Sequence, residues 1–359
     1  MSGPEAPAWR RFLPQPSDHN GSFPSASAHT GQSVLVTGAG GYIGSALVKA
    51  IAGAGPRCIV LLDSSEQRLF EIQRDLSGAF THVRHQAILG TVQDAALLDG
   101  VFSRYHPEIV YHAAAFKHVP LLELNPIEAV RNNTIGTYTV AQAARRHGTP
   151  KLVLISTDKA VNPHSVLGVS KRIAELALVA LSGPECRMNA IRLCNVIGSG
   201  GSVVPIFLEQ IAGRRPLTVT HPEASRWFLP LDETVAAVLA CGAAACEGNI
   251  LVPEPGEQVR IAELAAFLIR ADGNGKIPIL FTGLRPGDKL TEELVYRSEV
   301  RDGCVEGSLG VIKTCRLAVT QLESLVERLC NCIASQDVSG LIRALSSAVP
   351  EYVPSELVR

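Results

Sequence analysis

The sequence predicts an α/β fold with a doubly wound parallel sheet and a smaller C-terminal lobe. An apolar strand, a glycine-rich turn and a helix follow one another over residues 33–52. Short apolar runs then alternate with helical segments to about residue 193, the pattern of a parallel sheet covered by helices. Further on, glycines and prolines interrupt the pattern and indicate longer loops. We therefore expect a Rossmann-like sheet followed by a substrate-binding lobe.

The expected elements follow from short apolar runs, which indicate strands, and from longer helical segments between them. The strands are residues 33–37, 58–62, 82–89, 109–112, 152–155, 189–193 and 249–252. The helices are residues 45–52, 93–105, a long stretch from about residue 121, the segment that carries Lys171, and residues 232–246, 261–270 and 322–335.

The chain divides into three expected parts. Residues 1–30 are rich in Pro, Ser, Gly and Ala and indicate a tail or an arm on the surface. Residues 31–190 form the NAD-binding Rossmann domain, and residues 230–255 return to it with a helix and a strand. Residues 191–229 and 256–359 remain for the substrate-binding lobe.

Composition limits the classes of function. Hydrophobic residues make up 46% of the chain, enough to build a core, and the formal net charge of -1 provides no basic field for nucleic acid or a membrane surface. We find no apolar run of roughly 20 residues that would span a membrane, and no signal peptide. The nine cysteines form no CxxC pair. We expect a cytoplasmic protein with free thiols and no metal.

The glycine-rich turn is the first candidate site. Gly38 permits a tight turn, Gly41 lets the backbone approach a pyrophosphate, and Gly44 lets the helix pack closely on the strand. The N-terminus of that helix presents unpaired N–H groups to phosphates. We expect the cofactor to be bound here by Gly38, Gly41, Tyr42, Ile43 and Gly44.

The end of the second strand predicts which cofactor is bound. Asp63 lies about 20 residues beyond the glycines, where a carboxylate binds an adenosine ribose and repels a 2′-phosphate. NAD is therefore favoured over NADP, although the neighbouring Arg68 could meet a 2′-phosphate. Ser64 is expected beside the cofactor as well.

A run of alanines ends a later strand. Small side chains there would let a cofactor lie against the backbone, although three alanines are equally plain packing material. The candidate cofactor-binding residues are Ala113, Ala114 and Ala115.

A polar corner follows the strand at residues 152–155. Thr157, Asp158 and Lys159 lie side by side where a buried strand delivers side chains to a cleft, and Lys171 follows on the next helix. An Asp acts as an acid only when protonated and a Lys as a base only when neutral, so both need shifted pKa values. Alternatively, Asp158 and Lys159 cap the next segment or pair on the surface, and Lys171 is solvated.

These residues belong to blocks that resemble a known family. The blocks are residues 37–44, 112–120, 133–137, 156–163, 198–205 and 285–289. They are similar to the capsular-polysaccharide group of nucleotide-sugar 4,6-dehydratases, which are extended short-chain dehydrogenases/reductases and whose best-known substrate is UDP-N-acetylglucosamine. Many members carry membrane spans ahead of the catalytic part, which we do not expect here.

The resemblance implies a tightly held NAD, a nucleotide-sugar substrate and a homo-oligomer. The sugar is oxidised at C4, a base removes the C5 proton while an acid assists loss of the C6 hydroxyl, and hydride returns to C6. By position, Asp158 would be the acid and Lys159 the base. Thr157 would lie near the C4 hydroxyl, and Lys171 would hydrogen-bond the nicotinamide ribose.

The resemblance also assigns binding residues. Asn133 would bind the cofactor, and the substrate-binding residues would be Lys117, Asn195, Arg226 and Arg285. Arginine suits a diphosphate because its planar fork donates two parallel hydrogen bonds. His112 and His118 are expected to be structural.

Leu167 departs from the family. The superfamily usually has a tyrosine there as the base for hydride transfer, and this group often has methionine. Leucine carries no proton, so oxidation at C4 would rely on Thr157, Lys171 or a water. Cys194 and Gly200 are smaller departures, at positions that usually hold glycine and often arginine.

Three hypotheses remain open from the sequence. The first is an NAD-dependent nucleotide-sugar 4,6-dehydratase. The second is an epimerase that forms a transient ketone without losing water, including on an unusual sugar in antibiotic or polysaccharide biosynthesis. The third is a cofactor-binding regulator that has lost turnover.

Overall fold

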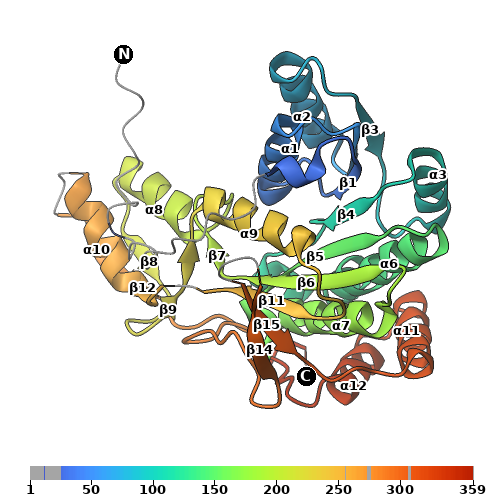
Figure 1. The fold of residues 1–359 in the computed structure, drawn as a ribbon. Helices are drawn as coiled ribbons and strands as arrows, with labels where there is room; N and C mark the ends of the chain where they lie inside the picture. The colour runs from blue at the N-terminus through green and yellow to red at the C-terminus, as the bar shows by residue number, and fades with distance from the viewer. Residues whose placement is uncertain (1–11, 13–25, 255, 273–275, 306–308, 359) are drawn as a thin grey trace.

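A nine-stranded sheet forms the centre of the computed structural model, which describes residue 12 and residues 26–254, 256–272, 276–305 and 309–358 (Figure 1). Its strands are β1 (Ser33–Thr37), β2 (Cys58–Asp63), β3 (His85–Leu89), β4 (Ile109–His112), β5 (Lys151–Thr157), β6 (Arg187–Leu193), β11 (Ile250–Pro253), β14 (Val300–Val305) and β15 (Leu309–Lys313).

The strand order is β14-β15-β11-β6-β5-β4-β1-β2-β3. From β11 to β3 every neighbouring pair is parallel, and β15 and β14 add an antiparallel edge. The order reverses between β1 and β4, which is the Rossmann arrangement and brings the carboxyl ends of both strands to one crevice. The predicted fold class is confirmed.

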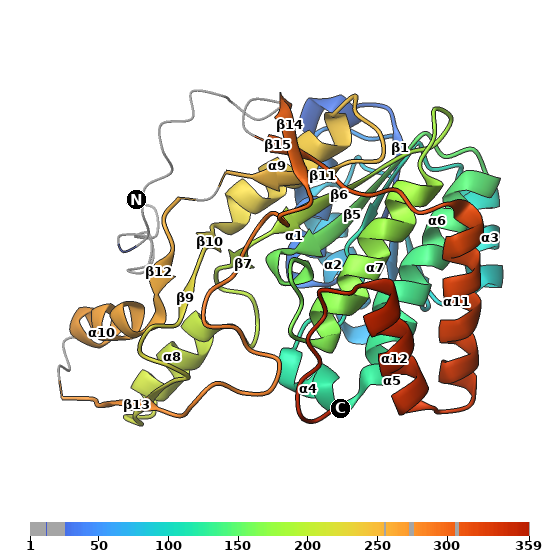
Figure 2. The ribbon, with the colours of Figure 1, turned by 90° about the horizontal axis from the view of Figure 1, so that it is seen from below.

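Helices cover both faces of the sheet. On one face lie α1 (Tyr42–Gly53), α2 (Glu66–Ala79) and α9 (Leu231–Ala243). On the other lie α3 (Ala95–Tyr105), α6 (Gly136–Arg146) and α7 (Val166–Leu181), with α11 (Val319–Ala334) and α12 (Val338–Ala348) packed outside α7 (Figure 2). Every residue of α7 is therefore buried, including its charged ones.

The long helix expected from about residue 121 is broken into pieces. It consists of α4 (Val119–Leu124), α5 (Pro126–Val130) and a π-helical turn at Arg131–Ile135 that runs into α6. Pro126 begins α5 because proline fits the first helical turn but cannot continue a helix before it. The π-helical turn carries Asn133.

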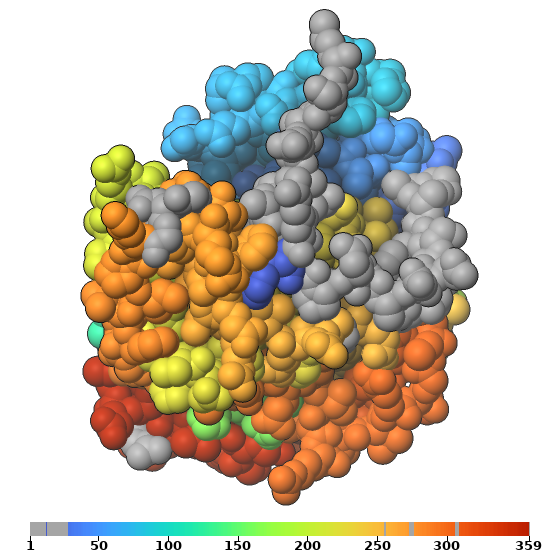
Figure 3. All heavy atoms as spheres, turned by 90° about the vertical axis from the view of Figure 1, so that its left-hand side faces the viewer, coloured from blue at the N-terminus to red at the C-terminus, as the bar shows by residue number. Residues whose placement is uncertain are grey.

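A smaller lobe is built from segments on either side of α9. It contains α8 (Val203–Ala212), α10 (Ile261–Ala271) and three pairs of short strands: β8 (Leu217–Val219) with β13 (Ile279–Phe281), β7 (Asn195–Val196) with β10 (Phe228–Leu229), and β9 (Ser225–Arg226) with β12 (Val259–Arg260). Its apolar core, which includes Phe207 and Leu264, forms its own cluster. Figure 3 shows α10 and its neighbours in orange below the blue N-terminal half.

The C-terminal segment differs from the expected division. The sequence pattern places all of 256–359 in the lobe, but β15 pairs with β11 at the edge of the main sheet, and α11 and α12 cover α7. Leu309 and Ile312 are fully buried in the core shared with the sheet, which explains this placement.

The N-terminal boundary differs as well. The tail expected at residues 1–30 lies mostly outside the described residues. The described fold begins at a 3-10 turn, Ala26–His29, whose His29 is buried and 2.8 Å from the hydroxyl of Tyr111 through Nε2. Phe12 stacks on Phe267 of α10 with ring centroids 4.9 Å apart. Among the described residues, no helix has the length and apolar character needed to cross a bilayer.

Candidate active site

The glycine turn between β1 and α1 forms a cradle that any larger side chain would fill. Gly38 has a φ of 66°, and a Cβ there would lie 2.7 Å from the backbone nitrogen of Ala114. A Cβ on Gly44 would collide with the carbonyl oxygen of Gly38. No side chain caps the first turn of α1, so its N–H groups, from Tyr42 and Ile43 onward, remain free to meet phosphates. These residues fit a dinucleotide.

Asp63 lies at the end of β2 beside this turn. Its carboxylate accepts hydrogen bonds from the backbone N–H of Gly40 and of Ser65, both at 2.9 Å. Ser64 is exposed next to it. A Cβ on Gly40 would lie 2.5 Å from the Cβ of Arg68, so that arginine crosses the same turn. The carboxylate of Asp63 thus holds the turn in place. The exposed Ser64 beside it lies where the adenosine of the cofactor is expected.

The loop after β4 lies directly against Gly38. Ala113 and Ala114 are half-buried and Ala115 is exposed. Asn133 is fully buried, and its amide accepts from the N–H of Phe116 at 2.9 Å and donates to the Phe116 carbonyl at 3.1 Å. Asn133 therefore holds this loop, and its contact with a cofactor stays a prediction.

The polar corner at the end of β5 is buried, so it is not a surface ion pair. Asp158 has 0% exposure, and its Oδ1 accepts from Thr157 Oγ1 at 3.0 Å and from Lys159 Nζ at 2.9 Å. Asp158 Oδ2 has no hydrogen-bond partner among the described residues. Helix α7 packs tightly here, because a Cβ on Gly168 would collide with the carbonyl oxygen of Lys159.

Lys159 has two further neighbours. Its Nζ donates to Asn195 Oδ1 at 3.1 Å and lies 3.5 Å from Glu292 Oε1. Burial alone would lower the pKa of Lys159, but the charges of Asp158 and Glu292 outweigh burial and raise it. Lys159 is thus an ammonium in this state, whereas the base role implied by the resemblance needs a neutral amine. The direct hydrogen bond to Asp158 allows one proton to pass between the two groups.

Lys171 is buried rather than solvated. It is 3% exposed, and burial lowers its pKa to about 8 although the charge of Glu175 opposes the shift. His112 is structural, as predicted: its Nδ1 is 2.6 Å from Thr37 Oγ1 and its Nε2 2.9 Å from Thr137 Oγ1. Burial, and then Lys171, lower the pKa of His112 to about 3, so it stays neutral.

Leu167 lies in an apolar environment. It is 4% exposed and belongs to the cluster formed with Val166, Val169 and Ile173 of the same helix. Leu167 thus contributes to packing and has no group that could accept or donate a proton.

The loop after β7 lies across the crevice. The hydroxyl of Tyr42, at the start of α1, donates to the carbonyl of Ile197 at 2.8 Å, and Lys117 Nζ donates to the carbonyl of Gly200 at 2.9 Å. Burial and the charge of Arg68 lower the pKa of Lys117. These contacts connect the glycine turn, through this loop, to Asn195 and the corner.

The two expected phosphate-binding arginines are already paired within the protein. Arg226 donates to the carbonyls of Ser225 at 2.7 Å, Lys289 at 2.7 Å and Leu290 at 2.9 Å, so it holds the segment that carries Glu292. Arg285 is exposed and binds Asp288 on its own loop at 2.8 Å. Their binding to a substrate diphosphate stays a prediction.

Glu292 and Lys289 are site residues that the sequence pattern does not indicate. Glu292 is 3% exposed and Lys289 9%, although both lie in a segment without strand or helix periodicity. Leu294 is buried but Leu290 is exposed, so the apolar spacing around Glu292 gave no signal that this segment packs against the core.

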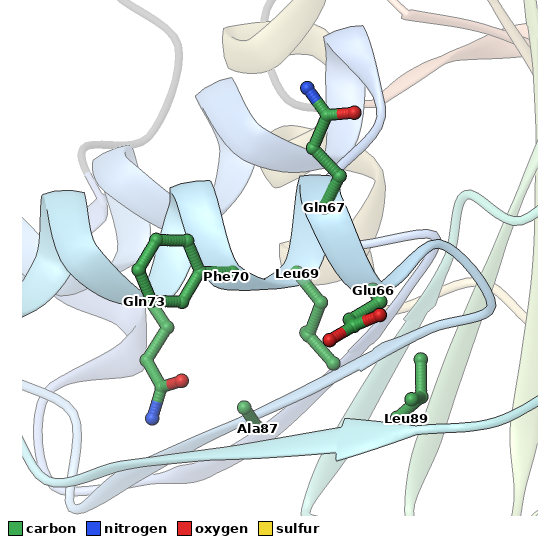
Figure 4. A pocket seen from close by; sticks show the side chains of 7 residues that line it. All are labelled: Glu66, Gln67, Leu69, Phe70, Gln73, Ala87 and Leu89. Atoms are coloured by element: carbon green, nitrogen blue, oxygen red, sulfur yellow. The ribbon is translucent and has the colours of Figure 1, made fainter.

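A separate surface hollow of about 440 Å³ lies between α2 and the edge strand β3 (Figure 4). Its lining residues are Glu66, Gln67, Leu69, Phe70, Gln73, Ala87 and Leu89. None of them is an expected site residue. No group of three or more His, Cys, Asp or Glu that could hold a metal occurs in the described part of the chain.

The parallel sheet, the glycine turn and the lysine-bearing helix α7 define an extended short-chain dehydrogenase/reductase of the nucleotide-sugar epimerase and dehydratase superfamily. A family model described as "Polysaccharide biosynthesis protein" matches residues 34–313. The chain belongs to this polysaccharide biosynthesis family.

Two curated relatives are bacterial. The probable polysaccharide biosynthesis protein EpsC of Bacillus subtilis is 46% identical over 274 residues, which cover 75% of this chain and 46% of EpsC. The capsular polysaccharide biosynthesis protein CapD of Staphylococcus aureus is 41% identical over 307 residues, covering 84% of this chain and 51% of CapD. The chain therefore spans about half the length of these relatives. A UDP-glucose 4-epimerase of Rickettsia rickettsii is 31% identical, covering 75% of this chain and 79% of the epimerase.

Solved structures share the fold. Pen from Bacillus thuringiensis superposes with a TM-score of 0.73 at 23% identity, covering 83% of this chain and 99% of Pen. DesIV, a dTDP-glucose 4,6-dehydratase from Streptomyces venezuelae with NAD and TYD bound, gives 0.64 at 23% identity, covering 73% of this chain and 88% of DesIV.

Proposed function

We propose that this chain is an NAD-dependent nucleotide-sugar 4,6-dehydratase in polysaccharide biosynthesis. The observation that carries the proposal is the pair of the fully buried Asp158 and the half-buried Lys159, joined at 2.9 Å at the carboxyl end of β5. A dehydration across C5 and C6 needs one group that takes a proton and one that gives a proton at adjacent carbons. Two neighbouring side chains that share a proton supply both.

The cofactor assignment is supported by the cradle of Gly38, Gly41 and Gly44 and by Asp63 at the tip of β2. NAD, when bound, would take hydride from C4 of the sugar and supply it again at C6. The carboxylate of Asp63 disfavours the 2′-phosphate of NADP.

The elimination would be carried out by the pair in its neutral form. The amine of Lys159 takes the proton from C5, and the electron pair of that C–H bond forms the C5–C6 double bond. The carboxyl group of Asp158 gives its proton to the C6 hydroxyl, which leaves as water with the electrons of the C6–O bond. The pair then stands as ammonium and carboxylate, the form favoured by the raised pKa of Lys159.

The C4 hydroxyl must also lose a proton. Leu167 cannot accept it, whereas Lys171, whose pKa is lowered by burial to about 8, is partly neutral near pH 8. We assign the proton of the C4 hydroxyl to Lys171, with Thr157 at the end of β5 orienting the hydroxyl. Lys117, Asn195, Arg226 and Arg285 are the proposed substrate-binding residues, of which the arginines would first have to release their present partners.

A nucleotide-sugar epimerase is the second candidate. The relative named UDP-glucose 4-epimerase favours it, being 31% identical over 278 residues. An epimerase would also oxidise the sugar to a transient ketone, but would then reprotonate a neighbouring carbon or return hydride to the opposite face of the oxidised carbon, without losing water.

Product masses separate the candidates. The protein would be incubated in deuterated water with UDP-, GDP- and TDP-sugars, and the products weighed by mass spectrometry. Loss of one water supports the dehydratase, and deuterium gained at constant composition supports an epimerase. A sugar isomer of unchanged mass, separated by chromatography, supports an epimerase that returns hydride to the oxidised carbon. No change in mass or chromatographic position with any sugar, on a preparation that holds NAD, would leave a binding role only.

A further inference from the structure

Glu292 is a buried carboxylate beside Lys159 to which neither the sequence pattern nor the family resemblance gives a role. Its Oε1 lies 3.5 Å from Lys159 Nζ and 3.6 Å from Arg226 Nε, and its Oε2 lies 3.8 Å from Lys289 Nζ. These distances are typical of ion pairs and are longer than that of a good hydrogen bond. Glu292 Oε2 has no hydrogen-bond partner among the described residues.

A buried carboxylate like that of Glu292 is a poor means of stabilising a fold. A buried carboxylate with an unpaired oxygen destabilises a fold unless nearby charges compensate. The cations around Glu292 are themselves anchored: Arg226 to backbone carbonyls of the same segment, and Lys289 to the carbonyl of Val161 at 2.6 Å. Glu292 therefore lies among three cationic side chains, of which Lys159 is the nearest, at 3.5 Å.

We propose that Glu292 is a positioning residue of the acid–base pair, whose carboxylate stabilises the ammonium that forms on Lys159 when the lysine takes a proton from the sugar. This role rests on the proposed dehydratase activity. Glu292 itself exchanges no proton. It acts through Lys159, which lies between two carboxylates within 3.5 Å of its nitrogen.

The physical effect is one of charge. Before elimination the Asp158–Lys159 pair is neutral, and afterwards it is an ammonium and a carboxylate. Asp158 becomes charged only in the same step, whereas Glu292 is already charged and favours the developing ammonium throughout. The raised pKa of Lys159 agrees with this, since Glu292 contributes to it alongside Asp158. Of the other groups that face Lys159, Arg226 opposes the rise, and Cys194 is kept neutral because burial raises its own pKa.

The test compares Glu292→Gln with Glu293→Gln. Glu293 is the matched control, because it neighbours Glu292 in sequence but is exposed and contacts Asn162 at 3.0 Å. Both proteins, purified with NAD, would be acylated competitively with acetic anhydride across a range of pH, and the extent at Lys159 read by peptide mass spectrometry. This measurement needs neither substrate nor turnover.

We expect the titration of Lys159 in Glu292→Gln to move to lower pH by about one unit or more, and that of Glu293→Gln to stay at the wild-type midpoint. Glu292→Asp keeps the charge and should restore much of the shift, which separates charge from misfolding. With a sugar that the wild type dehydrates, Glu292→Gln should eliminate water about 10- to 100-fold more slowly.

An unchanged Lys159 titration in Glu292→Gln would overturn the role of Glu292, even if the wild type dehydrates a sugar. An elimination rate of Glu292→Gln equal to or higher than that of the wild type would overturn it as well. Absence of dehydration by the wild type, with the titration shifted as expected, would instead defeat the dehydratase proposal. The two failures are therefore distinguishable.

Discussion

Two clusters of buried charge lie close together around β5 and α7, and they are built differently. One is a quartet of Arg172, Glu175, Arg192 and Glu299. Arg192 binds Glu175 at 2.8 Å and Glu299 at 2.7 Å, and Arg172 binds each of the same carboxylates at 3.1 Å. The other is the corner of Asp158, Lys159 and Glu292, described above.

The clusters differ in how completely their polar atoms are paired. No atom of the quartet is among the buried unpaired atoms of the described residues, whereas Asp158 Oδ2 and Glu292 Oε2 are. Burial would raise the pKa of Glu175, but Arg192 outweighs it and lowers that pKa, so Glu175 stays ionised. A saturated network holds a fold, and an unsaturated one keeps atoms available for a ligand or a proton. The difference supports a structural role for the quartet and the chemical role that we propose for the corner.

The quartet also holds the corner in place. Ser156, the residue before Thr157, donates to Glu175 at 2.7 Å. Tyr296, whose ring lies 4.4 Å from the Arg172 guanidinium carbon, donates its hydroxyl to the carbonyl of Ala160 at 2.5 Å. The saturated cluster is therefore the support on which the reactive one is positioned.

The largest expected effect is on catalysis at the corner. Lys159→Ala removes the group that we assign as base, so turnover should fall by about 10³-fold or more. The glycine cradle is untouched, so the NAD content of the purified protein should stay at the wild-type level. Water loss from a nucleotide sugar and bound NAD would be measured on the same preparation. Near-normal turnover would remove Lys159 from the mechanism.

A substitution in the quartet should instead lower the free energy of unfolding. Glu175→Ala leaves Arg192 buried with one partner fewer, and breaking a buried ion pair in this way costs about 3–5 kcal/mol. Urea unfolding would measure the change, with the exposed Glu293→Ala as control, for which less than about 0.5 kcal/mol is expected. A change as small as that of the control would end the distinction between the clusters.

The pH dependence of the first step should report Lys171. A lysine is neutral above its pKa, and burial lowers this one to about 8. Oxidation at C4 should therefore rise about tenfold per pH unit below pH 8 and level off above it. Stopped-flow absorbance of the reduced cofactor would follow this step. Lys171→Met should be slow and should lack this rise, and a variant that kept it would place the titrating group elsewhere.

The smallest effect is expected for the stability of Asp158→Asn. Asparagine keeps the Oδ1 acceptor used by Thr157 and Lys159 and replaces the oxygen that has no partner. The free energy of unfolding should change by less than about 1 kcal/mol, while turnover is lost. A loss comparable to that of Glu175→Ala would mean that the corner is as structural as the quartet.

The sequence predicts the parts of this picture that are local. The strand, turn and helix at 33–52 and the adjacency of Asp158 and Lys159 follow from the order of residues alone. Glu292 reaches the corner from a segment more than a hundred residues later, and only the fold brings it there. The direction of the Lys159 pKa could not be predicted either, because it depends on whether burial or two carboxylates prevail.

The strand β15 at the edge of the sheet was likewise not predicted from the sequence. The pairing of β15 with β11 is antiparallel, so β15 lies outside the alternation of strands and helices that identified the other strands. Helix α12 was not predicted either, although its 11 residues place Leu341, Ile342, Ala344 and Leu345 in the core.

The most direct test uses a UDP-sugar that carries deuterium at C4. The dehydratase account predicts a product that has lost water and carries the deuterium at C6, read by mass spectrometry and NMR. A product with the deuterium still at C4 and its water retained would contradict it.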